Sequence, residues 1–434
     1  MIINYFYLDL NYTKINNIIE IMLSLPKDNI IDICSFLNTN NLLKLILVCK
    51  ELYNFILNCK IIMIEKTFSV KYTITNLNFM NNLSYKIYNL DISFNKHIND
   101  NDFENLKNIH TLVMKYCNQN TITDKAFRHL KGIRTLNMSG CNQKTITDNA
   151  FENLQGIHTL DISCCKQGTI TDKAFENLKG IHTLNISKCA QNTITNRAFE
   201  NLKGIHTLNM SFCNQNTITD KAFENLKGIH TLNISNCKQN TITDDTFEHL
   251  KGIYTLNMSG CSQNTITDNA FQYLKDIHTL NISKCNQITD KTFKHLKGIY
   301  YLNMKYCNQN TITNDAFNNL KGIHTLDMSY CNQETISDKA FENLQGIHTL
   351  DMSYCNQNTI TDNAFKNLKS IHTLDISNCD QHTITDQAFI NLDSLKFLDI
   401  SNCNQLSYKS YSSQFNYLMN HILHNSIIIN KTDD

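Results

Sequence analysis

Thirteen cysteines recur at a nearly fixed interval, and a column of thiols could in principle form disulfides or bind a metal. Eight of them follow one another every 24 residues from Cys117 to Cys285, and after one 22-residue step five more run from Cys307 to Cys403. All thirteen occupy the same place in a repeated unit. We therefore interpret them as reduced, buried structural thiols, a common state for cysteine in protein interiors.

Histidines also recur once per repeat, and stacked imidazoles could share a metal ion. The series contains His158, His182, His206, His230, His324, His348 and His372. Arg134, Tyr254 and Tyr300 take the same place in other repeats. Since a metal site needs a local constellation rather than a copied position, we expect no metal here.

Asparagine and aspartate alternate in a third column, which could supply a pair of catalytic carboxylates. Its members include Asn137, Asp161, Asn185, Asp327, Asp351 and Asp375. We interpret them as polar residues on a solvated strand face. The chain also lacks a phosphate-binding glycine loop, a nucleophile elbow and zinc-ligand spacing. The sequence therefore predicts a protein that is not an enzyme and needs no cofactor.

The unit that positions these columns can be read from the stretch beginning at Ile133. Leu136 and Met138 lie two apart and point to one face of a short strand, with Asn137 on the other face. After a polar loop, Asp148 is expected to cap a short helix. A glycine follows each helix in nine repeats, where a left-handed residue commonly ends it; Asn108, Asp276, Ser370 and Ser394 replace it in four others, where we expect slight strain.

One strand–loop–helix–turn unit cannot bury its apolar side alone, whereas stacked units can. Strands pair about 4.8 Å apart and helices need about 10 Å, so the strand side must be concave. We expect an α/β fold: a curved solenoid with parallel strands on the concave face and short helices on the convex face. The LxxLxLxxC pattern of Ile133, Leu136, Met138 and Cys141 resembles the cysteine-containing class of leucine-rich repeats. The resemblance covers about 14 repeats.

A different pattern precedes the repeats and contains the single proline of the chain. Leu25-Pro26 is followed by Asp28 and then by spaced apolar residues, which predict short amphipathic helices. This pattern resembles the F-box, with Asp28 in place of the commoner Glu and Tyr53 where the family usually has Trp. The resemblance implies that a Skp-type adaptor, and through it a cullin, binds Leu25, Pro26, Ile30, Ile33, Leu37, Leu42, Leu45, Val48, Cys49 and Tyr53. The alternative is that these helices only cap the first strand of the solenoid.

These patterns divide the chain into five parts. We expect an N-terminal extension (1–22), an all-α F-box-like domain (23–59), a transition or irregular repeat (60–86), the solenoid (87–405) and a C-terminal cap and tail (406–434). Within the last part, the sequence predicts a closing helix at 414–424 and a final strand at 427–429.

Composition bears on partners and compartment. Among 434 residues, Lys plus Arg and Asp plus Glu each number 39, which argues against binding to nucleic acid or membranes by net charge. We see no secretory signal and no apolar run long enough to span a bilayer, so we expect an intracellular protein in the cytoplasm or nucleus. The Asn- and Ile-rich, near-identical repeats are similar to those of large amoeba-infecting DNA viruses.

Positions that vary between repeats are free to recognise a partner, and the residue before each cysteine varies most. Tyr306, Tyr330 and Tyr354 occupy this position in three consecutive repeats and would stack as an aromatic anchor. With Lys284 beside them and Phe212 further along, they form our candidate partner-binding patch. Drift among recently duplicated units is the alternative.

The sequence thus favours a protein-interaction module that recognises substrates for a Skp–cullin–F-box ubiquitin ligase. The adaptor would bind the N-terminal helices, and an unknown protein target would bind the concave face. The competing interpretation is a scaffold or inhibitor with no link to a ligase.

Overall fold

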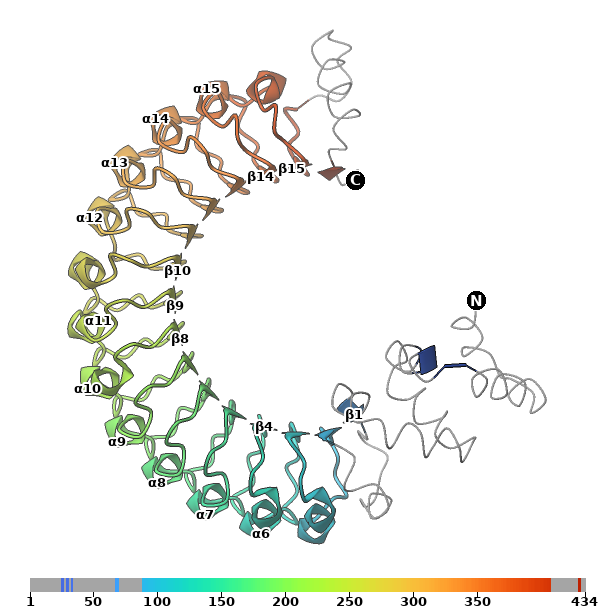
Figure 1. The fold of residues 1–434 in the computed structure, drawn as a ribbon. Coiled ribbons are helices and arrows are strands. Elements are labelled where there is room, and N and C mark those ends of the chain that lie inside the picture. Colours follow the sequence, from blue (N-terminus) through green and yellow to red (C-terminus); the bar gives the residue numbers. More distant parts are fainter. Residues whose placement is uncertain are drawn as a thin grey trace. The chain divides into compact units, whose positions relative to one another are not determined.

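The computed structural model describes residues 88–406, with short stretches at 25–26, 29–30, 33, 67–69 and 428–430. The chain divides into two compact units, Met1–Asn185 and Ile186–Asp434. Both units are built from the expected repeat of strand, loop, one-turn helix and turn (Figure 1).

In the first unit, the strands pair in parallel and in chain order. They are β1 (Thr67–Ser69), β2 (Asn89–Asp91), β3 (Thr111–Val113), β4 (Thr135–Asn137), β5 (Thr159–Asp161) and β6 (Thr183–Asn185). The connecting helices are η3 (Asp100–Leu106), α6 (Asp124–Phe127), η4 (Arg128–Leu130), α7 (Asp148–Phe151) and α8 (Asp172–Phe175). Because β1 pairs with β2 in the same parallel register, the sheet begins within the segment interpreted as an irregular repeat.

The second unit continues the same pattern. Its strands are β7 (Thr207–Asn209), β8 (Thr231–Asn233), β9 (Thr255–Asn257), β10 (Thr279–Asn281), β11 (Tyr301–Asn303), β12 (Thr325–Asp327), β13 (Thr349–Asp351), β14 (Thr373–Asp375), β15 (Phe397–Asp399) and β16 (Ile428–Asn430). Its helices are α9 (Asn196–Phe199), α10 (Asp220–Phe223), η5 (Glu224–Leu226), α11 (Asp245–Glu248), η6 (Asp268–Tyr273), α12 (Asp290–Phe293), α13 (Asn314–Phe317), α14 (Asp338–Phe341), α15 (Asp362–Phe365) and η7 (Asp386–Phe389). The final strand predicted at 427–429 is confirmed with a shift of one residue.

Strand pairing places equivalent residues of successive repeats side by side. Between β12 and β13, for example, Leu326 lies opposite Leu350 and Asp327 lies opposite Asp351. The strand leucines are fully buried, and the flanking residues are half-buried on the other face. Each repeated residue type therefore becomes a row that runs across the unit.

Curvature can be read from the spacing of these rows in the second unit. Buried phenylalanines on the helix side, such as Phe199 and Phe223, have ring centroids 6.1 to 6.5 Å apart. Tyr306 and Tyr330, next to the strands, are only 4.2 Å apart. The strands therefore lie on the concave side and the helices on the convex side, as the sequence predicts (Figure 1).

The prediction that Asp148 caps its helix is wrong, because the preceding threonine takes that role. Thr147 has extended backbone angles, and its hydroxyl accepts a hydrogen bond from the Asn149 N–H. Asp148 instead reaches the next repeat, where its carboxylate accepts bonds from the Thr171 N–H and hydroxyl, both at 2.7 Å. The aspartate therefore joins two repeats rather than ending one helix.

The glycines after the helices have the left-handed backbone that the sequence predicts, with Gly156 at φ 80°. Asn108 adopts the same conformation at φ 72°. Asp276, Ser370 and Ser394 do not have positive φ. Their backbone avoids the left-handed conformation, so the strain expected at these three turns is absent.

Among the described residues, no helix is long and apolar enough to cross a membrane.

Candidate functional site

The residue before each ladder cysteine lies in a tight turn that follows the strand. We call these residues the turn row; in the second unit they are Lys188, Phe212, Asn236, Gly260, Lys284, Tyr306, Tyr330, Tyr354, Asn378 and Asn402. All ten have positive φ, between 56° and 69°. Glycine and asparagine tolerate this conformation, whereas other residues lose about 1–2 kcal/mol. Lysine and tyrosine therefore occupy this position at a cost in stability, which makes it a candidate for function.

Three tyrosines of the turn row form the stack that the sequence predicts. Ring centroids are 4.2 Å apart both between Tyr306 and Tyr330 and between Tyr330 and Tyr354, and the rings are nearly parallel. Desolvation, together with Tyr354 and Tyr306, raises the pKa of Tyr330. The stack is therefore an uncharged, aromatic surface that is partly open to solvent.

Lysines border this stack. Lys284 Nζ lies 4.9 Å from the centre of the Tyr306 ring. Lys305 Nζ lies 5.7 Å from Tyr306 and 5.0 Å from Tyr330. Lys305 is not among the residues predicted from the sequence, although a signal was present: most other repeats have serine at this position. Cation–π contacts of this kind hold the lysine stems against the rings.

Phe212 lies apart from the tyrosine stack. Asn236, Gly260 and Lys284 separate it from Tyr306 along the turn row, and its ring is covered by Lys188 at 5.5 Å. Phe212 is 44% exposed. The predicted patch therefore consists of two aromatic sites, with the smaller one around Phe212.

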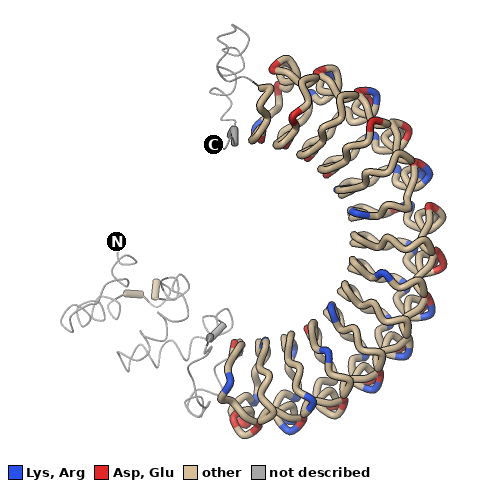
Figure 2. Tube along the Cα trace, turned by 180° about the vertical axis from the view of Figure 1, so that it is seen from behind, with Lys and Arg blue, Asp and Glu red and all other residues tan. Residues whose placement is uncertain are grey.

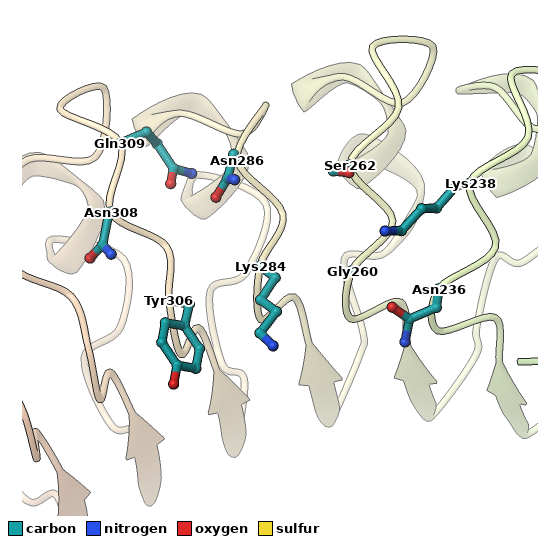
Figure 3. A pocket seen from close by; sticks show the side chains of 9 residues that line it. All are labelled: Asn236, Lys238, Gly260, Ser262, Lys284, Asn286, Tyr306, Asn308 and Gln309. Carbon is teal, nitrogen blue, oxygen red and sulfur yellow. The ribbon is translucent and has the colours of Figure 1, made fainter. Parts of the chain in front are cut away.

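A cavity of about 740 Å³ opens between these two sites (Figure 3). Its lining consists of Asn236, Lys238, Gly260, Ser262, Lys284, Asn286, Tyr306, Asn308 and Gln309. The ammonium group of Lys238 points toward Gly260, and the Asn236 side-chain oxygen lies 2.6 Å from the place where a Cβ of Gly260 would stand (Figure 3). Lys238 and Gly260 are not among the site residues predicted from the sequence.

The histidine column forms a continuous stack of rings in the second unit. Adjacent ring centroids are 3.9 to 4.8 Å apart. The row runs through His206, His230, Tyr254, His278, Tyr300, His324, His348 and His372. Tyrosine rings stack in the same row as the imidazoles. The stacking therefore requires a flat ring and does not require a nitrogen that could bind a metal. Among the described residues, no group of three His, Cys, Asp or Glu side chains is placed to hold a metal.

The Asn/Asp column has a structural role that either residue can perform. Asp351 Oδ1 accepts a hydrogen bond from the Ser353 N–H at 2.9 Å, and Asn257 Oδ1 does the same for Ser259 at 3.0 Å. Burial and neighbouring carboxylates raise the pKa of Asp327 and Asp375. These side chains are half-buried turn caps, not the solvated residues that the sequence suggested.

The ladder cysteines are buried, and their thiols donate to backbone carbonyls of the preceding repeat. Cys213 Sγ, for example, lies 3.1 Å from the Ile186 carbonyl oxygen. Burial raises the pKa of the Cys213 thiol to about 12. A thiol of this kind stays protonated and unreactive at neutral pH. Every cysteine that the structure describes is free of a disulfide.

Only part of the predicted adaptor-binding set can be located. Asn29, Ile30 and Ile33 are helical, and the Ile30 N–H donates to the Pro26 carbonyl at 3.2 Å. Ile30 is buried, Leu25 and Ile33 are half-buried, and Pro26 is exposed. Leu37, Leu42, Leu45, Val48, Cys49 and Tyr53 lie outside the described residues, as does the predicted closing helix at 414–424.

Charge is distributed differently on the two sides of each unit. Acidic and basic residues intersperse on the helix side (Figure 2), whereas the strand side carries fewer charges, among them the aspartates of β12 to β15. The side chains near the strands are therefore aromatic, amide and lysine, with carboxylates in β12 to β15.

Comparison with known families identifies two regions. Residues 96–227, 168–300 and 286–418 match the BspA type leucine rich repeat region, and residues 22–63 match the F-box domain. The finer assignment to the cysteine-containing repeat class stays a prediction. No curated protein sequence matches this chain.

Solved structures show the same fold at low sequence identity. The Toll–Spatzle complex of Drosophila aligns with 82% of this chain and 48% of that chain, at 13% identity and a TM-score of 0.62. A leucine-rich-repeat protein of Leptospira interrogans aligns over 84% and 95%, at 14% identity and a TM-score of 0.59. The chain spans about half the length of the Toll chains that it matches.

Proposed function

The chain belongs to the BspA-type leucine-rich-repeat proteins, and from this premise we propose that it is a substrate receptor of a Skp–cullin–F-box ubiquitin ligase. The observation that carries the proposal is the F-box match at residues 22–63, directly ahead of a repeat surface with exposed aromatic side chains. F-box and leucine-rich-repeat regions are both protein-interaction modules.

In this proposal the N-terminal helices bind the adaptor. A helix that includes Ile30 and Ile33 presents the Leu25-Pro26 end at its first turn, which fits the start of an F-box. The remaining predicted contacts follow in the sequence, from Leu37 to Tyr53. An intracellular location follows, since the ligase and the reduced thiols both belong to a reducing compartment. If the chain is viral, the adaptor and the cullin belong to the host.

The repeat surface binds the target, and the tyrosine stack is its proposed anchor. Aromatic side chains held at a partly exposed position contribute large contact areas with little loss of side-chain entropy. The protein itself forms and breaks no bonds. Its contribution is proximity, which raises the effective concentration of the target near the charged ubiquitin carrier.

Adaptor binding tests the ligase role. The full chain is co-purified with a eukaryotic Skp-type adaptor, beside the double variant Leu25→Ala, Pro26→Ala. We expect binding by the wild type and loss in the double variant, with an unchanged circular dichroism spectrum. If the folded wild-type chain captures no adaptor, the ligase role is wrong and the chain is a scaffold or inhibitor.

Target binding tests the tyrosine stack. Tyr330→Gly removes the central ring and also relieves the left-handed backbone, so the variant should fold at least as well as Tyr330→Ala. We expect both variants to lose most of their affinity for a captured target. Asn402→Gly, at the same position three repeats after Tyr330, serves as the matched control and should retain it.

A further inference from the structure

The cavity beside Gly260 lies where two departures from the repeat coincide. Gly260 is the single glycine of the turn row in the second unit. The following repeat has only 22 residues between Cys285 and Cys307, because its loop runs directly from Gln287 to Ile288 and lacks two residues that other repeats have. Strand pairing is unaffected, since β10 and β11 stay in register. The change is therefore confined to the loop that lines the cavity.

The cavity is cationic and has no carboxylate in its lining. Lys238 and Lys284 contribute two ammonium groups, and the other lining residues are amides, a hydroxyl, a glycine and Tyr306. Within residues 88–406, neither lysine forms an ion pair. Both charges are therefore available to a ligand.

Backbone donors add to this charge. In neighbouring repeats the asparagine after the cysteine accepts from the N–H of its counterpart one repeat later: Asn214 Oδ1 accepts from Lys238 at 2.7 Å, and Asn308 Oδ1 accepts from Asn332 at 2.9 Å. Between these points the series is broken, because lysine and serine replace two of the asparagines and the third lies in the shortened loop.

Three N–H groups consequently have no acceptor among the described residues. They belong to Ser262, Asn286 and Asn308, all of which are exposed and line the cavity. In six other repeats an asparagine side-chain oxygen accepts from this N–H, whereas at Ala190 and Asn214 the acceptor is also missing, because lysine and alanine stand one repeat earlier. A ligand oxygen can take the place of the acceptor here, and charge-assisted bonds of that kind are about twice as strong as neutral ones.

We propose that this cavity binds a carboxylate side chain of an acidic segment in the protein partner. The acidic group sits between Lys238 and Lys284 and accepts from the uncapped N–H groups, while the adjoining residues of the segment lie on the tyrosine stack. The inference rests on the proposed role as a protein-binding module, and it names the chemistry of the partner.

A protein segment fits better than a single-stranded nucleic acid. A nucleic acid would need a continuous basic track along the row of turns. Beyond Lys284, the turn row has three tyrosines followed by two asparagines. The strands β12 to β15 each carry an aspartate (Asp327, Asp351, Asp375 and Asp399). Those carboxylates repel any long anionic chain that follows the row, whereas a short segment whose acidic group stays in the cavity does not extend its charge over them.

The test uses the full chain and a fluorescein-labelled peptide of six glutamates, with binding followed by fluorescence anisotropy. We expect saturable binding that weakens as salt is added. Lys284→Glu and Gly260→Tyr should each weaken it by about tenfold or more, because one reverses a charge and the other adds a ring to the lining of the cavity. Lys188→Glu makes the same charge reversal at a turn-row position outside the cavity, and should bind like the wild type.

Gly260→Tyr is expected to fold because other repeats carry tyrosine in the same left-handed turn. A Cβ added at Gly260 would meet Asn236 Oδ1 at 2.6 Å, which is the movable end of a side chain. A second variant inserts Asn-Thr between Gln287 and Ile288, which restores the 24-residue repeat. It should weaken binding as well.

Equal affinity of the wild type and Gly260→Tyr would overturn the proposal. The proposal would also be overturned if inorganic phosphate or a uridine oligonucleotide bound more tightly than the peptide and displaced it, and if the same variants abolished that binding. Adaptor capture is measured on each protein in parallel. Peptide binding without adaptor capture would contradict the ligase role alone, and adaptor capture without peptide binding would contradict this inference alone.

Discussion

A single carboxylate shows how one residue ties two repeats together. Asp290 Oδ1 accepts from the Thr313 N–H at 2.8 Å, and its Oδ2 accepts from the Thr313 hydroxyl at 2.7 Å. Asn314 makes the equivalent contacts to Ser337, at 2.9 Å each. An amide therefore performs the same task as a carboxylate, which explains why both residues occur at this position.

We predict that Asp290→Ala lowers the free energy of unfolding by about 1–3 kcal/mol, because it leaves the Thr313 N–H without its acceptor. Asp290→Asn should be nearly neutral, as Asn314 already demonstrates in the next repeat. Urea unfolding followed by circular dichroism measures both. Equal losses for the two variants would show that charge, rather than hydrogen bonding, matters here.

Adjacent residues can also have opposite environments. Cys165 is buried, donates to the Met138 carbonyl at 3.2 Å, and has its pKa raised to about 12 by burial. Cys164 belongs to the turn row and is half-buried. We predict that a thiol reagent at neutral pH modifies Cys164 in the native protein and leaves Cys165 unmodified until unfolding.

Mass spectrometry of the labelled peptide tests this prediction, with Cys34, Cys49 and Cys59 changed to serine to simplify the result. Cys164→Ser should abolish native labelling. Cys165→Ser should leave it intact. Native labelling of the Cys164→Ser protein would contradict the assignment of the ladder thiols as buried.

At the scale of elements, rows of equivalent side chains act together. His348 stacks between His324 and His372, and its Nδ1 is buried without a hydrogen-bond partner among the described residues. Burial, then His372 and His324, then Lys396 lower its pKa from the ordinary value of 6.5. The folded state therefore binds this proton less readily than the unfolded chain does.

The unfolded chain takes up the His348 proton at a higher pH than the folded protein does, because the folded pKa is lowered. We therefore predict that the contribution of His348 to stability is full above about pH 6.5. It is lost as the pH falls toward the lowered native pKa. The raised pKa values of Asp327 and Asp375 have the opposite effect, because they increase the stability of the folded state as the pH falls through the range just above 3.8. Their stability deficit disappears as they become protonated.

Thermal unfolding between pH 7 and pH 5 measures the histidine effect. His348→Tyr should reduce the loss of stability on acidification, since Tyr254 and Tyr300 occupy the same row without disturbing it. His158→Tyr, in the first unit, is the matched control. An unchanged pH profile in His348→Tyr would show that the stacked imidazoles do not govern the response.

For the whole molecule, the repeat makes stability local and additive. Each strand, helix and buried phenylalanine contacts its counterparts in the next repeats, and chain segments far apart in sequence contribute little to one another. A solenoid of this kind tolerates the loss of a complete period much better than the loss of part of one.

We predict that deletion of residues 142–165, one full period, leaves a folded chain in which β4 pairs with β6. Deletion of residues 142–153 has half the length but interrupts the register of strand and helix, and should unfold several neighbouring repeats. Circular dichroism and cooperative unfolding distinguish the two. Similar spectra for both variants would contradict the nearest-neighbour picture.

The sequence by itself determined the architecture, because the spacing of Leu, Ile, Cys and Phe repeats so often that only stacked strand–helix units can bury them. It also determined the tyrosine stack, since three equal residues at equal spacing must lie side by side once strands pair in register. The sequence interpretation of Asp148 as a helix cap was wrong, because a local capping preference cannot reveal a partner in the next repeat.

Only the tertiary structure revealed the cavity. The left-handed turn places the side chain of one repeat against that of the next, so the effect of Gly260 depends on Asn236 and Lys284, which are 24 residues away in either direction. Whether three backbone N–H groups keep their acceptors likewise depends on asparagines in the preceding repeats. These properties arise from contacts between repeats, and the sequence shows which of the contacts are missing only after the structure has shown that they exist.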